Sequence, residues 1–170
     1  MYDITFLGNA PVDVLMNVTD DILQHYKLDK GNFIQVSPQT LEEILEQVPE
    51  EKRKIMPGGS GANTAHAFTK LGGKAALCAY VGDDPQGQIF YQSMTDAGID
   101  MPKPVAGKRS LVIYVLITPD GERTFIHASG GDSLPPRATI GESGLMKEAI
   151  QASKWLYIEG YLFSEDFPAI

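Results

Sequence analysis

The sequence predicts an α/β protein with a doubly wound, mainly parallel sheet, and three observations lead to this class. Residues 56–100 read as a glycine loop, a helix, a strand, a turn and a second helix in direct succession. Two further apolar runs, residues 3–8 and 155–159, have the length and composition of buried strands. The 170 residues are 43% hydrophobic and 21% charged, as in one ordinary globular domain.

The glycine loop begins after Pro57. Gly58, Gly59 and Gly61 lack a Cβ, so the main chain can take a positive φ and come close to a ligand. Asn63 follows at the mouth of a helix, where its amide can cap the helix or face a bound group. The helix is expected to bury one side, formed by Ala62, Ala65, Ala67, Phe68 and Leu71.

The remaining elements follow from local patterns. Residues 75–81 predict a buried strand and residues 86–97 a helix that ends at Gly98. In the N-terminal part we expect strands at 12–18 and 33–36, a short helix from Asp20 to about residue 26, and a helix that begins at Ser37-Pro38. Its apolar face is Leu41, Ile44, Leu45 and Val48.

The second half predicts a β-hairpin, a helix and a strand. Residues 110–118 and 123–128 are rich in β-branched and aromatic residues and are separated by the turn Pro119-Asp120-Gly121. Residues 144–153 have the spacing of a helix, and residues 155–159 form the last predicted strand. We expect that strand to lie inside the sheet, with neighbours on both sides.

Bulk properties exclude several function classes. The formal net charge of −8 argues against nucleic acid as the main partner. The only cysteine, Cys78, falls in a predicted strand, so no disulfide can form within the chain and a cytoplasmic location is expected. No apolar run approaches the roughly 18 residues of a membrane span. The three histidines have no ligand-like spacing, so no metal site is predicted.

Two carboxylates follow predicted strands at their carboxyl ends, where open α/β sheets bind ligands. Asp13 lies just past the turn after residues 3–8 and can accept hydrogen bonds from vicinal hydroxyls. A solvated turn residue or a loop cap is the alternative reading of Asp13. Glu159 ends the last predicted strand, and its alternative is a partner of a backbone amide.

The exact sequence motifs in these segments are more specific for a protein family than their hydrophobic pattern is. PGG, AN, LGG, VGDD, G and AGI occur in this order over about 45 residues, after GNAPVD near the N-terminus. This series resembles the N-terminal signature of the PfkB (ribokinase-like) family of carbohydrate and nucleoside kinases, in its adenosine kinase-like or fructokinase-like branch. The resemblance implies a ribokinase-like fold with a small β lid near residues 12–36 and 109–128.

The resemblance also implies a function and its residues. It implies ATP-dependent phosphorylation of a sugar or nucleoside hydroxyl, with ATP and Mg²⁺ as cofactors of the complete enzyme. The substrate-binding residues that it implies are Asn9, Asp13, Gly58, Gly59, Asn63 and Glu159. Ser60 stands where ribokinases proper often carry Lys, which speaks against ribose and for a nucleoside or ketose. Tyr114, Phe125 or Phe33 could supply a wall for a purine, and an open lid edge predicts a homodimer through the lid.

One family element is missing from the sequence. The D-T-x-G-A-G-D motif, which supplies the family's catalytic Asp and anion hole, does not occur in residues 1–170. We therefore assign no catalytic residue, and we expect a truncated chain: the N-terminal part of a single kinase domain, without the nucleotide-binding part. The alternative from another class is a non-catalytic sugar- or nucleoside-binding module or pseudokinase fragment. An NAD(P)-linked oxidoreductase is disfavoured because the third Gly of its fingerprint is absent.

Overall fold

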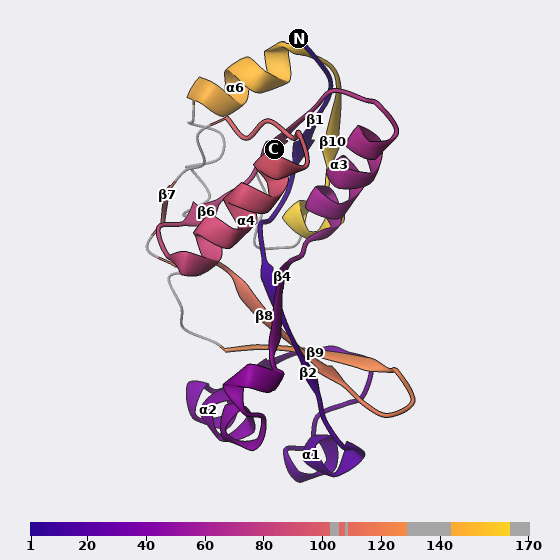
Figure 1. The fold of residues 1–170 in the computed structure, drawn as a ribbon, viewed down its shortest axis with the longest axis vertical. Helices are drawn as coiled ribbons and strands as arrows, with labels where there is room; N and C mark the ends of the chain where they lie inside the picture. The colour runs from indigo at the N-terminus through magenta and orange to yellow at the C-terminus, as the bar shows by residue number, and fades with distance from the viewer. Residues whose placement is uncertain (103–105, 108, 129–143, 164–170) are drawn as a thin grey trace. The chain divides into compact units, whose positions relative to one another are not determined.

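The computed structural model describes residues 1–102, 106–107, 109–128 and 144–163 (Figure 1). The chain forms two compact units, each of which is assembled from separate stretches of sequence. Unit 1 comprises Met1–Pro11, Pro57–Leu111 and Asp132–Ile170, and unit 2 comprises Val12–Met56 and Val112–Gly131. Apart from residues 109–111, the predicted lid segments fall in unit 2, together with the helix that begins after Ser37.

Unit 1 is built on a three-stranded parallel sheet in the order β10-β1-β5. Its strands are β1 (Tyr2–Leu7), β5 (Ala75–Cys78) and β10 (Ser153–Ile158). Every residue of β5 is buried, as an apolar strand covered on both faces requires. Among the described strands β10 has only β1 as a neighbour, so the expected second neighbour is not found in this part of the chain.

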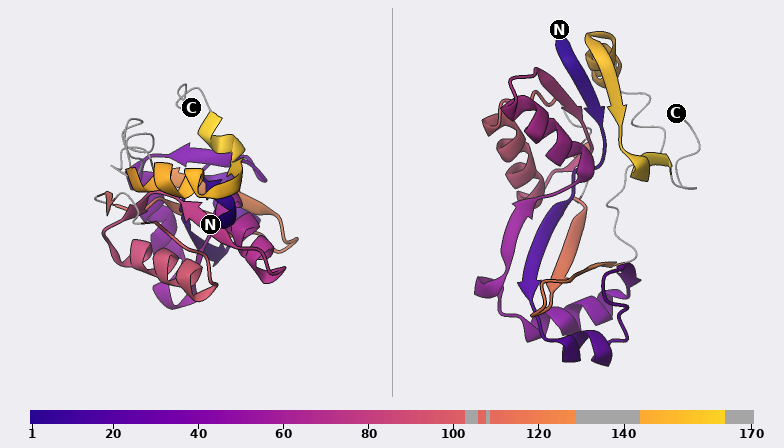
Figure 2. Two further views of the ribbon diagram at one scale, coloured as in Figure 1. Left: turned by 90° about the horizontal axis from the view of Figure 1, so that it is seen from above. Right: turned by 90° about the vertical axis from the view of Figure 1, so that its right-hand side faces the viewer.

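Two helices cover opposite faces of this sheet (Figure 2). α3 (Ser60–Lys70) packs on the face of Phe6, whose ring lies 6.0 Å from that of Phe68. α6 (Gly144–Gln151) packs on the other face, where the Thr5 hydroxyl donates to the Ala149 carbonyl. Because Thr5 and Phe6 are adjacent in a strand, they point to opposite faces. The sheet is therefore doubly wound, as predicted.

A small substructure follows β5. β6 (Val81–Gly82) pairs in parallel with β7 (Ala106–Gly107), and α4 (Pro85–Asp96) lies between them in sequence. The predicted strand 75–81 is thus divided, because the ladder of β5 ends at Cys78. Asp84 is the N-cap of α4 and accepts from the Gly87 N–H at 2.8 Å. A short 3₁₀ turn, η2 (Gly160–Phe163), follows β10.

Unit 2 contains a five-stranded sheet in the order β3-β9-β8-β2-β4. Its hairpin, β8 and β9, is antiparallel as predicted, while β2 pairs with β8 and β3 with β9 in parallel. The strands are β2 (Val12–Asn17), β3 (Phe33–Val36), β4 (Lys54–Pro57), β8 (Val112–Ile117) and β9 (Arg123–Ala128). The sheet is mixed, whereas the sheet of unit 1 is parallel.

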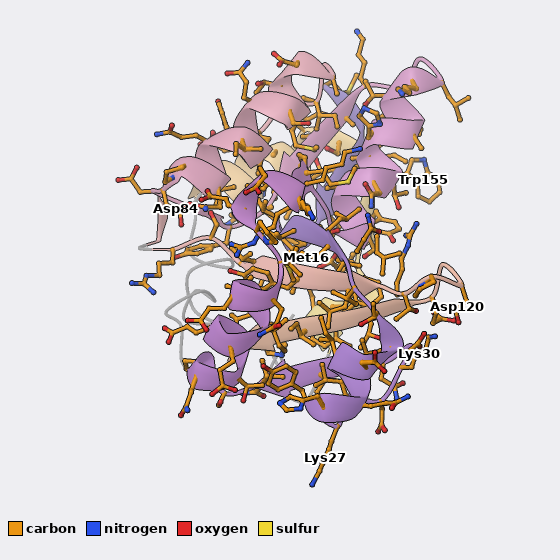
Figure 3. All side chains as sticks on the ribbon, turned by 60° about the horizontal axis from the view of Figure 1, so that its bottom comes forward. Met16, Lys27, Lys30, Asp84, Asp120 and Trp155 are labelled. Carbon is orange, nitrogen blue, oxygen red and sulfur yellow. The ribbon has the colours of Figure 1, made fainter. Side chains whose placement is uncertain are left out.

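The core of unit 2 lies between one face of this sheet and two helices, α1 (Asp20–His25) and α2 (Pro38–Gln47). Val14 and Met16 of β2 pack there with Leu41 and Ile44 of α2. On the outer surface Lys30 bridges Asp20 and Asp120 at 2.7 and 2.6 Å, and Figure 3 shows Lys30 beside Asp120.

One strand was not predicted, and two side chains were predicted on the wrong side of a helix. Residues 54–57 form β4, because their pairing with β2 outweighs the polar pattern before them. Ala67 and Leu71 were expected on the buried side of the helix but are exposed, Leu71 by 88%. At about 100° per residue, Ala67 lies about 160° around the helix from Ala65, which is fully buried, and Leu71 is the C-cap, just beyond the last helical residue Lys70.

Candidate functional site

Five of the six predicted site residues lie in unit 1, and the sixth, Asp13, lies in unit 2. Asn9 follows β1, Gly58 and Gly59 precede α3, and Glu159 follows β10. Asn63 lies in the first turn of α3, and Asp13 lies in β2 of unit 2. Asn9 and Glu159 thus stand at the carboxyl ends of neighbouring parallel strands, as the strand order requires.

The Glu159 carboxylate is at the centre of this group. The residue is 1% exposed. Its Oε1 accepts from the Asn9 backbone N–H and from the Asn9 Nδ2, both at 2.6 Å. Its Oε2 accepts from the Ser60 hydroxyl at 2.8 Å and from the Gly61 N–H at 3.1 Å. One side chain therefore joins the ends of two strands to the first turn of α3.

Two glycines make room for this carboxylate. A Cβ at Gly8 would lie 2.9 Å from both Cδ and Oε2 of Glu159, and one at Gly61 would lie 3.3 Å from Oε2. The first distance is shorter than real Cβ contacts, and the neighbour is a buried group with four hydrogen bonds. The packing around the Glu159 carboxylate thus explains why glycine occupies positions 8 and 61.

The glycine loop itself is held against the chain that follows β1. The Gly58 N–H donates to the Pro11 carbonyl at 2.9 Å, so it is used inside unit 1. Gly59 has φ +93°, and a Cβ there would lie 2.9 Å from the Asn9 carbonyl oxygen and from Pro11 Cδ. Among the described residues no hydrogen bond uses the Gly59 N–H. No described protein group therefore competes with a ligand for this donor.

Asn63 is exposed, and its side chain does not cap the helix. Its backbone N–H donates to the Gly59 carbonyl at 3.0 Å, the first bond of α3. No hydrogen bond within the described ranges uses its amide group, which is able both to donate and to accept. The structure thus shows no capping role for the Asn63 side chain, and its contact with a bound group stays a prediction.

Asp13 differs from Glu159 in every respect that matters for binding. It is half-buried in β2, and none of the hydrogen bonds in the described part of the chain ends on its carboxylate. Burial raises its pKa above the ordinary value for Asp, and the positive charge of Arg123 opposes that shift. A partly desolvated acceptor without a protein donor is suited to receive hydrogen bonds from a ligand.

Asp13 lies on the face of its sheet that is opposite the helices. Its register partner Ile113 lies there with it, whereas Val14 and Tyr114 point to the core under α1 and α2. Tyr114 is thus unable to supply the predicted aromatic wall on the side of Asp13. Phe125 and Phe33 are register partners on the face of Asp13, so these two predicted wall residues remain.

Sequence reasoning missed the roles of two polar side chains. Ser60, considered only as a replacement for Lys, donates its hydroxyl to Glu159. Asp84 was taken as part of a turn, yet its carboxylate also accepts from the Ser110 N–H and hydroxyl, both at 2.7 Å. Burial pushes the pKa of Asp84 upward, but the bonds from Ser110 and Gly87 outweigh it and lower the pKa. Only contacts far apart in sequence could reveal either role.

Two features are not found among the described residues. Among them, no group of three or more His, Cys, Asp and Glu side chains is placed to hold a metal ion. None of the helices in the described ranges is both long and apolar enough to cross a membrane.

Comparison with known proteins gives one family for most of the chain. Residues 31–169 match the family described as pfkB family carbohydrate kinase. The match begins within unit 2 and runs through the glycine loop, α3, the hairpin and β10.

Individual relatives fall into sugar and nucleoside kinases. The chain is 33% identical over 87 residues to an aminoimidazole riboside kinase of Salmonella typhimurium, covering 49% of this chain and 27% of that protein. It is 40% identical over 72 residues to fructokinase-1 of Oryza sativa subsp. japonica, covering 41% and 22%. The solved adenosine kinase of Sinorhizobium meliloti has 27% identity and a TM-score of 0.71, with 96% of this chain and 48% of that chain covered. The chain thus spans about half the length of that structure, and its alignments span about a quarter of those two relatives.

Proposed function

The chain belongs to the pfkB family of carbohydrate kinases, and from this premise we propose that it carries the substrate-binding half of an enzyme that phosphorylates a hydroxyl of a sugar or nucleoside with ATP. The observation that carries the proposal is the family match over residues 31–169. The α/β fold with a separate mixed sheet supports it.

We assign the contact with substrate hydroxyls to Asp13. A carboxylate that is half-buried and unused by the described protein donors has acceptor capacity for two hydroxyl groups. Hydrogen bonds to a charged group are stronger than those between neutral groups, so Asp13 is expected to contribute the largest polar term in substrate binding.

Within unit 1, taken by itself, two groups are proposed as ligand contacts. The Gly59 N–H donates toward a ligand oxygen, and the exposed amide of Asn63 donates or accepts. The Gly58 N–H is used by Pro11, so the contribution of Gly58 to binding is limited to the close approach that its missing Cβ permits.

A nucleoside is the substrate class that we favour, with a ketose such as fructose as the second candidate. Phe33 is 59% exposed, and its ring stacks on His127 with 5.0 Å between centroids. Phe33 pairs with Phe125, whose strand position places it on the face of Asp13. Rings beside a carboxylate suit a ligand that combines a planar base with a hydroxylated sugar.

ATP and Mg²⁺ are expected of the complete enzyme, and we assign none of the described residues to either group. They contain no cluster of metal ligands, and the sequence has no D-T-x-G-A-G-D motif. We therefore assign no step of phosphoryl transfer to residues 1–170. An assay with radiolabelled ATP is expected to show no turnover by this chain. Phosphoryl transfer by this chain would refute the proposal that it carries only the substrate-binding half.

Binding of adenosine, fructose and ribose tests the proposal. Thermal shift identifies a ligand and titration calorimetry gives its affinity. Asp13→Ala is expected to weaken binding by about 1–3 kcal/mol, the cost of a lost hydrogen bond to a charged group. Asp29→Ala removes an exposed aspartate of the same unit and serves as the matched control. Equal affinities of both variants would remove Asp13 from the site.

The non-catalytic binding module remains the alternative function. It shares every substrate contact with the kinase proposal and differs only in needing no ATP. Joining this chain to a partner that carries the D-T-x-G-A-G-D motif separates the two: the kinase predicts recovered turnover, and the module predicts binding alone.

A further inference from the structure

We propose that Glu159 is a positioning residue, which fixes the glycine loop and Asn9 in place and does not itself contact the substrate. The inference rests on the proposed function, since it concerns which residues of that site touch the ligand. It reassigns two predicted contacts, Glu159 and Asn9, to the support of two others, Gly59 and Asn63.

The first argument is that the Glu159 carboxylate has no acceptor capacity left. Two oxygens offer about four lone-pair directions, and four protein donors already fill them at 2.6 to 3.1 Å. The residue is 1% exposed, and Gly8 and Gly61 close on it. A substrate hydroxyl would have to displace one of these donors, two of which are backbone N–H groups that cannot turn to another acceptor.

The second argument is that α3 begins without a cap of its own. Its N-cap residue is Gly59, which has no side chain, and its first turn has no acidic residue. The first N–H groups of a helix have no partner within the helix. Glu159, 98 positions away in sequence, accepts from the Gly61 N–H, and its negative charge stands at the positive end of the helix dipole. The carboxylate thus replaces a local cap.

The third argument is that Glu159 holds both sides of the contact that shapes the loop. Oε1 holds Asn9, Oε2 holds Ser60 and Gly61, and Gly59 packs between them against the Asn9 carbonyl oxygen. The free N–H of Gly59 and the first turn that carries Asn63 are therefore set by this one carboxylate. Its loss would displace both proposed donors without removing either of them.

Glu159→Gln tests this role with little change in shape. An amide presents one oxygen where the carboxylate presents two, so its NH₂ must face donors on one side. We expect the affinity for adenosine to fall about tenfold. The same fall is expected for 2′-deoxyadenosine and 3′-deoxyadenosine, because Glu159 touches none of the hydroxyls. Asp13→Asn, in contrast, should lose less affinity for the deoxy analogue that lacks the hydroxyl bound by Asp13, because that contact is already absent.

A ligand-free measurement keeps the inference independent of the proposed function. In Glu159→Gln the amide protons of Asn9 and Gly61 are expected to exchange with solvent about tenfold faster by NMR. The Leu77 amide of β5, bonded to the Asp100 carbonyl at 2.8 Å, is the internal reference. Glu148→Gln, an exposed glutamate of α6, is the control for loss of one charge.

The outcomes separate the two hypotheses. If exchange accelerates but adenosine, fructose and ribose bind neither to the original chain nor to Glu159→Gln, the proposed function fails for this chain, while the structural part of the inference, that Glu159 fixes Asn9 and Gly61, stands. Unchanged exchange at Asn9 and Gly61 overturns the inference. A penalty from Glu159→Gln that vanishes with one deoxy analogue makes Glu159 a contact residue and also overturns it. A lower melting temperature with unchanged affinity shows a purely structural role and refutes positioning.

Discussion

Replacing Gly59 by alanine tests whether the glycine loop needs glycine for its conformation alone or also for its packing. Gly72 offers the comparison, since its φ of +91° is almost the same as the +93° of Gly59. Nothing lies within 4 Å of a Cβ at Gly72, whereas a Cβ at Gly59 meets the Asn9 carbonyl oxygen and Pro11 Cδ at 2.9 Å. The first of these atoms is backbone and cannot move away cheaply.

The expected costs follow from these distances. A non-glycine residue at such a φ costs about 1–3 kcal/mol, and this term applies to both variants. The forced contact at Gly59 adds about 1–3 kcal/mol, as overpacking does. Gly59→Ala should therefore unfold with about 1–3 kcal/mol less free energy than Gly72→Ala. Against a typical stability of about 5–15 kcal/mol the variant remains foldable and measurable.

Urea denaturation followed by far-UV circular dichroism measures both variants under the same conditions. Gly59→Ala should in addition weaken ligand binding, because the loop must shift to accommodate the methyl group, while Gly72→Ala should not. Equal free energies of unfolding for the two variants would show that the contact with Asn9 and Pro11 is relaxed at no cost. The close packing of the loop would then lose its role in the site.

Three further predictions concern the pKa shifts and a helix cap. Burial raises the pKa of Asp13, so its ionised form lowers stability above that raised pKa, and the penalty disappears below the ordinary Asp value. Asp13→Asn should hence stabilise the ligand-free chain at neutral pH and lose this gain in acid, as urea titrations at several pH values would show. Burial, with a smaller contribution from Asp100, raises the pKa of the Cys78 thiol to about 12; iodoacetamide should modify it in urea and leave the native chain unmodified, and rapid native labelling would contradict this. Ser37→Ala should cost about 1 kcal/mol, since the Ser37 hydroxyl accepts from the Thr40 N–H at 3.0 Å. Thr19→Ala, at an N-cap without such a bond, should cost less in the same denaturation assay.

Local patterns predicted most elements of the fold. The Ser37-Pro38 start of α2, the hairpin at Pro119-Asp120-Gly121 and the buried strand β5 all depend on neighbours in sequence, and all are found. β4 and β7 were missed because two to four residues carry too little pattern, and their partners lie far away in sequence. The prediction that Ala67 and Leu71 lie on the buried side of α3 was wrong, because small residues such as Ala67 fit either face of a helix.

The candidate site was predictable in its positions but not in its division of roles. Strand ends and the family resemblance indicated Asn9, Asp13 and Glu159, all with polar side chains after apolar runs. Whether a carboxylate is saturated by protein donors depends on residues about 100 and 150 positions away, such as Gly61 and Asn9 for Glu159. No local pattern contains that information, so Asp13 and Glu159 received the same prediction.

A motif can be specific to a family without every residue in it touching the ligand. Gly8 and Gly61 each stand against the buried carboxylate of Glu159, and Gly59 stands against Asn9. If Glu159 were changed to a residue without an acceptor, the Gly61 N–H and both Asn9 donors would be left buried or unpaired, at a cost for each such group. A chain of this fold that lacks a carboxylate at this position must therefore supply another acceptor to the start of α3. This requirement comes from the geometry of the glycine loop and holds whichever hydroxylated ligand the loop binds.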